Sequence, residues 1–261
     1  MHLRRLSNTA LTFSAFLPSL ALANEGSGPV VVNYYALLLS SLHLDLKYGA
    51  LLSSLLTLLI CILIGLAFRR SLSNPSPENL APSNKITLRF FVEMICDFVY
   101  SLSKEHCGHN YLGFLPLISA LFIFILVCNL TGLVPGFPPA TENFSVNLAM
   151  GLMVFFTYNI AGFRQHGLAY IKQFTGPFLL LAPLFLGIEL ISHAVRPLSL
   201  AFRLLANIFC DHLLLGVFSN LAPLVVPSLF LCFGLLVAVI QSFVFALLTG
   251  IYINMAISHD H

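Results

Sequence analysis

Charged side chains are scarce in this 261-residue chain: Asp, Glu, Lys and Arg make up 8% of it, against about 25% in an ordinary soluble domain. Hydrophobic residues make up 58%, which excludes a water-soluble enzyme. Twelve Lys and Arg against ten Asp and Glu leave a formal charge of +2. That charge is too small and too dispersed for the basic face of a nucleic-acid-binding protein. The expected partners are therefore lipid and other membrane proteins.

The motifs of several chemistries are missing as well. The sequence contains no GxxxxGK[ST] phosphate-binding loop and no catalytic triad pattern. Its six cysteines are scattered and four lie in apolar runs, so they form no disulfide framework. Residues 105–109 have zinc-ligand types but lack a second ligand pair at structural-zinc spacing. We expect no cofactor, no metal site and no catalysis by this chain alone.

The N-terminus has the pattern of an export signal. Arg4 and Arg5 precede an apolar stretch at 10–22, which ends in a small-x-small cleavage pattern. The alternative is an uncleaved anchor, but the stretch is shorter than the roughly 20 residues of a spanning helix. We predict a cleavable signal at 1–23 and a single membrane domain at 24–261. In either case the chain that follows begins outside.

Five apolar runs are long enough to cross the roughly 30 Å hydrocarbon layer at about 1.5 Å per residue. The sequence therefore predicts an all-α integral membrane protein. The runs fall at about 46–68, 114–134, 146–163, 174–218 and 223–257. The last two exceed one perpendicular crossing, so these helices should be strongly tilted or broken, partly at Pro183, Pro197 and Pro227.

The distribution of Lys and Arg predicts the orientation. Residues 69–113 contain five of these cations and residues 163–173 contain two. The loops at 136–143 and 219–222 contain none, and the N-terminal tail that remains after removal of the signal has only Lys47. The N-terminus should therefore be periplasmic and the C-terminus cytoplasmic, in agreement with an export signal.

Between the first two spans, residues 85–104 have the pattern of an amphipathic helix. Their apolar residues recur at intervals of three and four, at Leu88, Phe91, Ile95, Phe98 and Leu102. We expect an interfacial helix on the cytoplasmic surface. A soluble helix packed on a partner domain is the alternative.

Ionisable residues cluster in the fourth apolar run, although a charge at mid-bilayer costs about 2.5–3.5 kcal/mol. At about 100° per residue, six polar residues share one helical face: Glu189, His193, Arg196, Arg203, Asn207 and Asp211. We call these six residues the polar face; His212 lies off it. The face extends over about 33 Å at 1.5 Å per residue. In the simplest structural interpretation Arg196 and Asp211 snorkel to the interfaces, which leaves Arg203 unexplained.

The last run contributes Gln241. If the last two runs form an antiparallel hairpin, Arg203 lies level with Ala238, and Gln241 is within one turn of that depth. A neutral amide can satisfy guanidinium donors without cancelling the charge. An interhelical hydrogen bond that only holds the hairpin together is an equally open interpretation.

The segments RPLSLAFRLLAN (196–207), IQSFVF (240–245) and NLTGLVPGF (129–137) together resemble subunit a of the F-type ATP synthase, the non-catalytic membrane stator of a proton-driven rotor. The likeness covers roughly residues 35–257. It implies that the two long helices lie against a ring of c subunits. It also implies two offset half-channels separated by Arg203, which matches the family's essential arginine. The implied partners are the c-ring, the b subunits and the catalytic headpiece, in a bacterial inner membrane.

The resemblance also suggests a proton path. Glu189 matches an acid of the cytoplasmic exit, with His193 beside it, whereas Asn207, His212 and Gln241 match positions on the periplasmic side. The last helix often has His or Glu where this chain has Gly234, so the carried-over path is incomplete. We hypothesise that Asp211, at similar depth in the hairpin, replaces that relay group.

Two other classes compete with this interpretation. A stand-alone ion-coupled transporter would have a substrate site around Arg203, and a purely structural scaffold would need no arginine there. The sequence also leaves Na⁺ open as the coupling ion, because ion choice resides largely in the c subunit.

Overall fold

The computed structural model describes residues 49–72, 88–107, 111–134, 137–167, 182–218 and 225–258. Within these ranges the chain is helical apart from short connections, so the predicted all-α class is confirmed. The elements are α4 (Gly49–Leu72), α5 (Leu88–His106), α6 (Tyr111–Gly132), the short 3-10 helix η4 (Ala140–Glu142), α7 (Phe144–His166), α9 (Ala182–Phe218) and α10 (Val225–Ile257). The predicted export signal at 1–23 lies outside the described residues, and the division into signal and membrane domain stays a prediction.

Five of these helices are long and apolar enough to cross a membrane, which confirms the predicted number. They are α4, α6, α7, α9 and α10, and their ends lie within a few residues of the predicted ones except at the start of α9. Among the described residues α9 begins at Ala182, immediately before a proline, which is well tolerated in a first turn. The predicted helical residues 174–181 lie outside the described ranges.

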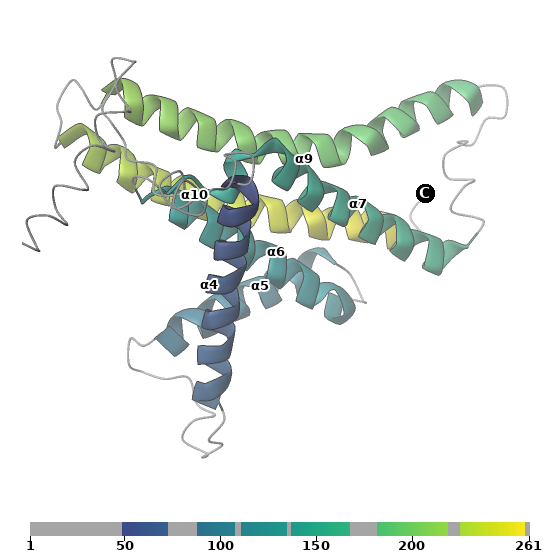
Figure 1. The fold of residues 1–261 in the computed structure, drawn as a ribbon. Helices are drawn as coiled ribbons and strands as arrows, with labels where there is room; N and C mark the ends of the chain where they lie inside the picture. The colour runs from purple at the N-terminus through teal and green to yellow at the C-terminus, as the bar shows by residue number, and fades with distance from the viewer. Residues whose placement is uncertain are drawn as a thin grey trace, which may run out of the picture.

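Helices α9 and α10 are 37 and 33 residues long and run antiparallel beside each other (Figure 1). This confirms the predicted pair of long hairpin helices. Of the two predicted alternatives, a strong tilt or a break, a break does not occur at Pro197, because α9 continues through this proline. Instead α9 bends near its middle (Figure 1). An internal proline explains a bend, because it removes one backbone hydrogen bond and crowds the preceding turn.

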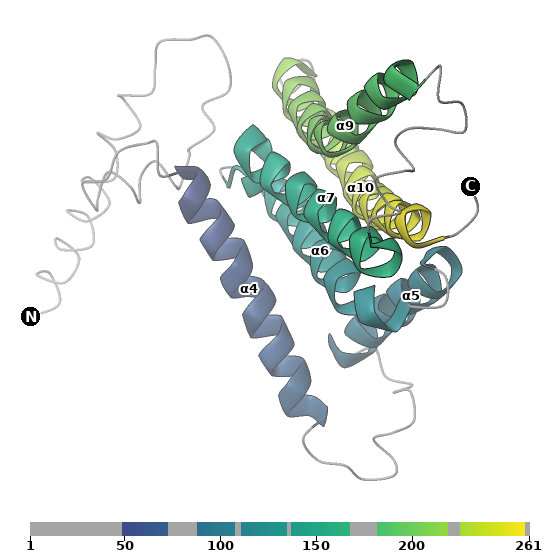
Figure 2. The same ribbon diagram turned by 90° about the vertical axis from the view of Figure 1, so that its right-hand side faces the viewer.

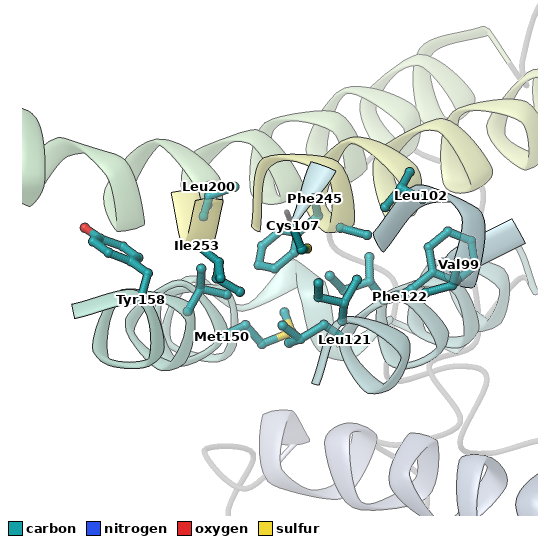
Figure 3. Packing of buried hydrophobic residues seen from close by; sticks show 14 of the residues in the cluster. Val99, Leu102, Cys107, Leu121, Phe122, Met150, Tyr158, Leu200, Phe245 and Ile253 are labelled. Atoms are coloured by element: carbon teal, nitrogen blue, oxygen red, sulfur yellow. The ribbon is translucent and has the colours of Figure 1, made fainter. Parts of the chain in front are cut away.

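The apolar core lies where α5, α6, α7, α9 and α10 meet (Figure 3). Helix α6 is apolar all round and packs against α4, α5 and α10, as expected for a central helix. Its Ile118 and Ile125 are fully buried, together with Val154 of α7 and Phe245 and Ile253 of α10. This core supports α10 and α7, against which α9 packs.

The predicted amphipathic helix is α5, which packs against α6 and α10. Val99 and Leu102 are its buried apolar residues, and Arg89 pairs with Glu93 at 2.6 Å on a more polar side. The predicted apolar stripe is only partly buried, because Phe91 is 57% exposed. The buried side is centred on Val99, and the exposed aromatic is free to contact lipid, as an interfacial helix requires.

Helix α4 stands to one side of the other helices (Figure 2). It exposes many leucines, among them Leu51, Leu55 and Leu63. Its buried positions include the small residues Ser53 and Thr57, and small residues allow transmembrane helices to approach closely. Exposed leucine on a membrane helix is ordinary, because lipid tails are as apolar as leucine.

Candidate functional site

The polar face predicted from the sequence lies on α9, and its residues divide into two groups around Arg203. The N-terminal group consists of Glu189, His193 and Arg196, and the C-terminal group of Asn207, Asp211 and the off-face His212. His193 is buried, His212 is exposed, and the others are half-buried. At 1.5 Å per residue, Arg203 is about 15 Å from His193 and about 12 Å from Asp211 along a helix axis.

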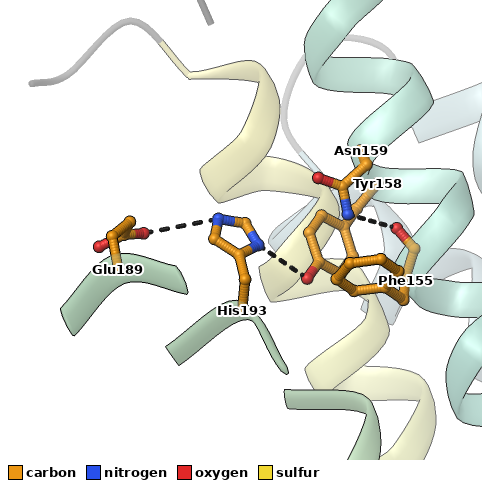
Figure 4. Close-up of polar contacts among 5 residues, drawn as sticks. All are labelled: Phe155, Tyr158, Asn159, Glu189 and His193. Atoms are coloured by element: carbon orange, nitrogen blue, oxygen red, sulfur yellow. Dashed lines mark hydrogen bonds and ion pairs between the residues drawn. The ribbon is translucent and has the colours of Figure 1, made fainter. Parts of the chain in front are cut away.

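The N-terminal group extends to α7 through His193 (Figure 4). The Tyr158 hydroxyl lies 3.0 Å from Nδ1 of His193. On the other side of the ring, Nε2 lies 3.5 Å from Oε1 of Glu189. Tyr158 is 1% exposed and His193 8% exposed, whereas the Glu189 side chain is 38% exposed. The three residues form a row of proton-carrying groups that runs from the protein interior to an accessible carboxylate.

Arg196 is held by two aromatic rings. Its Cζ lies 5.9 Å from the ring centroid of Tyr158 and 5.4 Å from that of Tyr252 in α10. A guanidinium within about 6 Å of an aromatic centroid is attracted to the ring face. Three helices, α7, α9 and α10, therefore meet at this point, with two tyrosines around one permanent cation.

A glycine allows α7 and α9 to approach closely near the N-terminal group. A Cβ added at Gly151 would lie 2.6 Å from the carbonyl oxygen of Pro197. Tyr158 follows Gly151 by seven residues, which places both on one face of α7. His193 precedes Pro197 by one turn. The glycine contact and the Tyr158–His193 hydrogen bond are therefore two points on one antiparallel interface.

Arg203 lies between the two groups and is half-buried. Among the described residues it has no hydrogen-bond or ion-pair partner. Gln241 is also half-buried, and its Oε1 atom is buried without a hydrogen-bond partner. The predicted contact between the Gln241 amide and the Arg203 guanidinium is thus not made in this structure and stays a prediction.

In the C-terminal group, Asp211 faces the glycine predicted to lie at its depth. A Cβ added at Gly234 would lie 3.9 Å from Oδ2 of Asp211, which confirms the predicted register of the hairpin at this pair. The same Cβ would lie 2.8 Å from Cδ2 of Leu133. Because Gly234 has no side chain, the Leu133 side chain occupies the space beside it, and the Asp211 carboxylate lies next to that space.

His212 points away from the polar face and reaches the connection between α6 and α7. Its Nδ1 lies 4.0 Å from Oε1 of Glu142 in η4, and the two side chains are 41% and 45% exposed. The neighbouring Thr141 is buried and donates a hydrogen bond to Oδ1 of Asn129, at 3.1 Å. Asn147 in turn donates to the carbonyl of Thr141, at 2.7 Å. These bonds hold η4 against α6 and α7, and η4 also packs against α9.

Sequence reasoning missed both Tyr158 and Glu142. A tyrosine in an apolar run is a usable signal, because a buried phenol normally requires a hydrogen-bond partner. The signal does not name the partner, since nothing in the sequence sets the register of α7 against α9. Glu142 was assigned only to a loop, and no pattern connects that loop to His212.

The zinc-like stretch at 105–109 provides no metal site within the described residues, where no three His, Cys, Asp or Glu side chains gather as metal ligands. Residues 108–110 lie outside the described ranges. Cys107 is buried against α10, 3.2 Å from where a Cβ at Gly250 would lie. Burial raises the pKa of its thiol to about 11. The cysteine is thus a packing residue at the α5–α10 contact.

The fold and site define a class: a multi-pass α-helical membrane protein with ionisable groups along one long membrane helix, among them an arginine that pairs with no other side chain in the described part of the chain. Residues 51–254 match the protein family described as ATP synthase A chain. The chain belongs to this family, which sets aside the alternatives of a stand-alone transporter and a scaffold.

Individual relatives agree with the family match. The chain is 41% identical to "ATP synthase subunit a" of Bdellovibrio bacteriovorus over 199 residues, 76% of this chain and 86% of the relative. It is 45% identical to the protein of the same name from Geotalea uraniireducens over 174 residues, 67% of this chain and 76% of the relative. A protein of that name from Citrifermentans bemidjiense is 43% identical over 174 residues, again 67% of this chain and 76% of the relative.

Proposed function

We propose that Arg203 separates two offset proton half-channels that this chain forms against a ring of c subunits. The chain is the non-catalytic, proton-conducting membrane subunit of an F-type ATP synthase, and the proposal concerns how it conducts. The observation that carries the proposal is the position of Arg203: a permanent cation on a membrane helix, between two groups of proton-carrying side chains and without a partner in the described chain. Such a charge is costly unless a group from another chain meets it.

A ring carboxylate that crosses lipid must be protonated. When it approaches a guanidinium to about 4 Å, the attraction is about 4 kcal/mol at an effective dielectric constant of about 20. This attraction favours the ionised carboxylate and displaces its proton. Lysine is a poor substitute for Arg203, because a buried ammonium can lose its proton and guanidinium does not. Each proton supplies about 2.3 kcal/mol per 100 mV of membrane potential.

We assign Glu189 and His193 to the cytoplasmic half-channel. The cations Arg69 and Arg70 end α4, and Arg164 lies in the last turn of α7, which supports a cytoplasmic location for these ends. His166 at the end of α7 contacts the carbonyl of Ile257 at the end of α10, at 3.1 Å. The two helix ends therefore lie on one side, which supports a cytoplasmic C-terminus and a periplasmic N-terminus.

We assign Asn207, Asp211, His212 and Gln241 to the periplasmic half-channel, with Asp211 as the relay beside Gly234. The exposed pair of His212 and Glu142 suits the entrance of this half-channel, because histidine exchanges protons near neutral pH. By this proposal the partners are the c-ring, the b subunits and the catalytic headpiece, in a bacterial inner membrane. We take protons as the coupling ion; the choice between protons and Na⁺ resides largely in the c subunit.

The decisive experiment measures ATP-driven proton pumping in inverted membrane vesicles that carry the whole complex. Arg203→Ala and Arg203→Lys should each abolish pumping while the complex still assembles with c and b subunits. Arg164→Ala, which removes an exposed arginine at the end of α7, is the matched control and should pump normally. Normal pumping by Arg203→Ala would contradict the proposal.

A further inference from the structure

The row of Tyr158, His193 and Glu189 joins two helices, and only its α9 members have a role in the proposed function. Tyr158 comes from α7, is almost fully buried, and makes the shortest polar contact of the row, at 3.0 Å. A buried phenol with this geometry can fix the orientation and the proton position of the imidazole that it contacts.

The geometry of the two ring nitrogens sets the direction of the hydrogen bonds. Nε2 of His193 faces a carboxylate oxygen of Glu189 at 3.5 Å. An ionised carboxylate only accepts hydrogen bonds, so it favours a proton on Nε2. In the neutral ring, Nδ1 is then an acceptor, and the Tyr158 hydroxyl must donate to it. The carboxylate of Glu189 thus selects the tautomer, and the Tyr158 hydroxyl completes the arrangement by donating to Nδ1.

We propose that Tyr158 is a positioning residue of the cytoplasmic proton path, which holds neutral His193 with its transferable proton on Nε2, directed at Glu189. The inference rests on the proposed function, because it needs His193 to relay protons. When His193 takes up a second proton, Nδ1 becomes a donor and the phenol oxygen accepts from it. Tyr158 therefore remains hydrogen-bonded in both protonation states, and the ring need not turn between them.

The surroundings of His193 favour this fixed orientation. Its ring stacks on the ring of Tyr158, with centroids 5.7 Å apart, and meets Phe155 edge-on at 6.4 Å. The guanidinium of Arg196 also lies over the Tyr158 ring, 5.9 Å from its centroid. The 3.5 Å gap to Glu189 is slightly longer than an ordinary hydrogen bond. Glu189 is partly exposed, so it is the member that can move to close this gap and release a proton to water.

The test is Tyr158→Phe, which keeps the ring beneath Arg196 and removes only the hydroxyl. We expect ATP-driven proton pumping per assembled complex to slow by about three- to tenfold, the equilibrium effect of losing one hydrogen bond of ordinary strength. Tyr252→Phe is the matched control: this tyrosine also lies beneath Arg196 but makes no hydrogen bond to His193, and its variant should pump within twofold of the wild type.

If Tyr158 only stabilised the fold, Tyr158→Phe would also slow pumping, so a second comparison tests whether its effect depends on His193. In a His193→Leu background, Tyr158→Phe should cause no additional loss. A loss of less than threefold for the single variant, or the same loss in both backgrounds, would overturn the inference. Loss of pumping in Arg203→Ala would still support the proposed function, so the two failures are distinguishable.

A spectroscopic measurement gives a second test that does not depend on turnover. With ¹⁵N-labelled histidine in the whole complex at pH 8, the signal that disappears in His193→Leu belongs to His193. It should show a protonated Nε2 and an unprotonated Nδ1, and Tyr158→Phe should reduce that preference. A proton on Nδ1 in the wild type would overturn the inference.

Discussion

Replacing Gly151 with alanine should separate α7 from α9 at the point where the polar face begins. The added Cβ would lie 2.6 Å from the backbone oxygen of Pro197. Even close favourable carbon–oxygen contacts are about 3.3–3.6 Å long, so the two helices must move apart by about 0.7–1 Å. Because both atoms are anchored to helical backbone, no side-chain rotation relieves the contact.

The expected cost is about 1–3 kcal/mol, the usual range for overpacking a well-packed interior. For a chain of this size that corresponds to a fall of about 2–12 °C in the unfolding midpoint. The same movement would lengthen the 3.0 Å contact between Tyr158 and His193 beyond hydrogen-bond range. Gly151→Ala should therefore also slow proton pumping at temperatures where the complex is intact.

The assay heats the purified complex in mild detergent and measures the midpoint at which this subunit leaves the assembled fraction. Gly65→Ala in α4 is the matched control, because a Cβ there meets nothing within 4 Å. Its midpoint should equal or exceed that of the wild type, since alanine favours helix over glycine. If Gly151→Ala melted within 1 °C of Gly65→Ala, the close approach of α7 and α9 would be refuted.

Three further outcomes are expected. Asp211→Asn should reduce proton-coupled ATP synthesis in reconstituted vesicles at least tenfold, because an amide cannot relay a proton; unchanged synthesis would remove Asp211 from the path. Glu142→Gln should leave the unfolding midpoint within 2 °C, because its exposed pair with His212 contributes at most about 1 kcal/mol, and a larger fall would show a structural role. In variants that keep only one cysteine, a maleimide at pH 8 should label Cys96 faster than Cys107. Burial raises the pKa of both thiols, to about 11 for Cys107, so little reactive thiolate forms there at pH 8. Cys96 is also exposed, whereas Cys107 is buried. Equal labelling would contradict this assignment.

Much of this architecture follows from local patterns in the sequence. Long apolar runs predict membrane helices because only a helix satisfies its own backbone in lipid. The 100° spacing predicted the polar face of α9, and the antiparallel hairpin expected for the last two helices predicted a register that placed Asp211 opposite Gly234. These features depend on one helix or on one hairpin, which sequence periodicity describes well.

Contacts between elements that are distant in sequence were not predictable in the same way. Tyr158 meets His193 across 35 positions, and the connection between α7 and α9 is too long to set a register. Glu142 reaches His212 from a loop that has no periodicity. The bend of α9 in place of a break at Pro197 is likewise a tertiary outcome, because packing against α7 and α10 holds both halves in one helix.

The central claim is that the Arg203 guanidinium faces acids of a rotor belonging to another chain. The most direct measurement is the distance from its Cζ atom to the nearest c-ring carboxylate in a structure of the assembled complex. We predict about 4 Å at the closest rotor position, with proton-carrying side chains of α9 on both sides. An Arg203 side chain directed at acyl tails, or separated from every rotor carboxylate by intervening helices, would contradict the account.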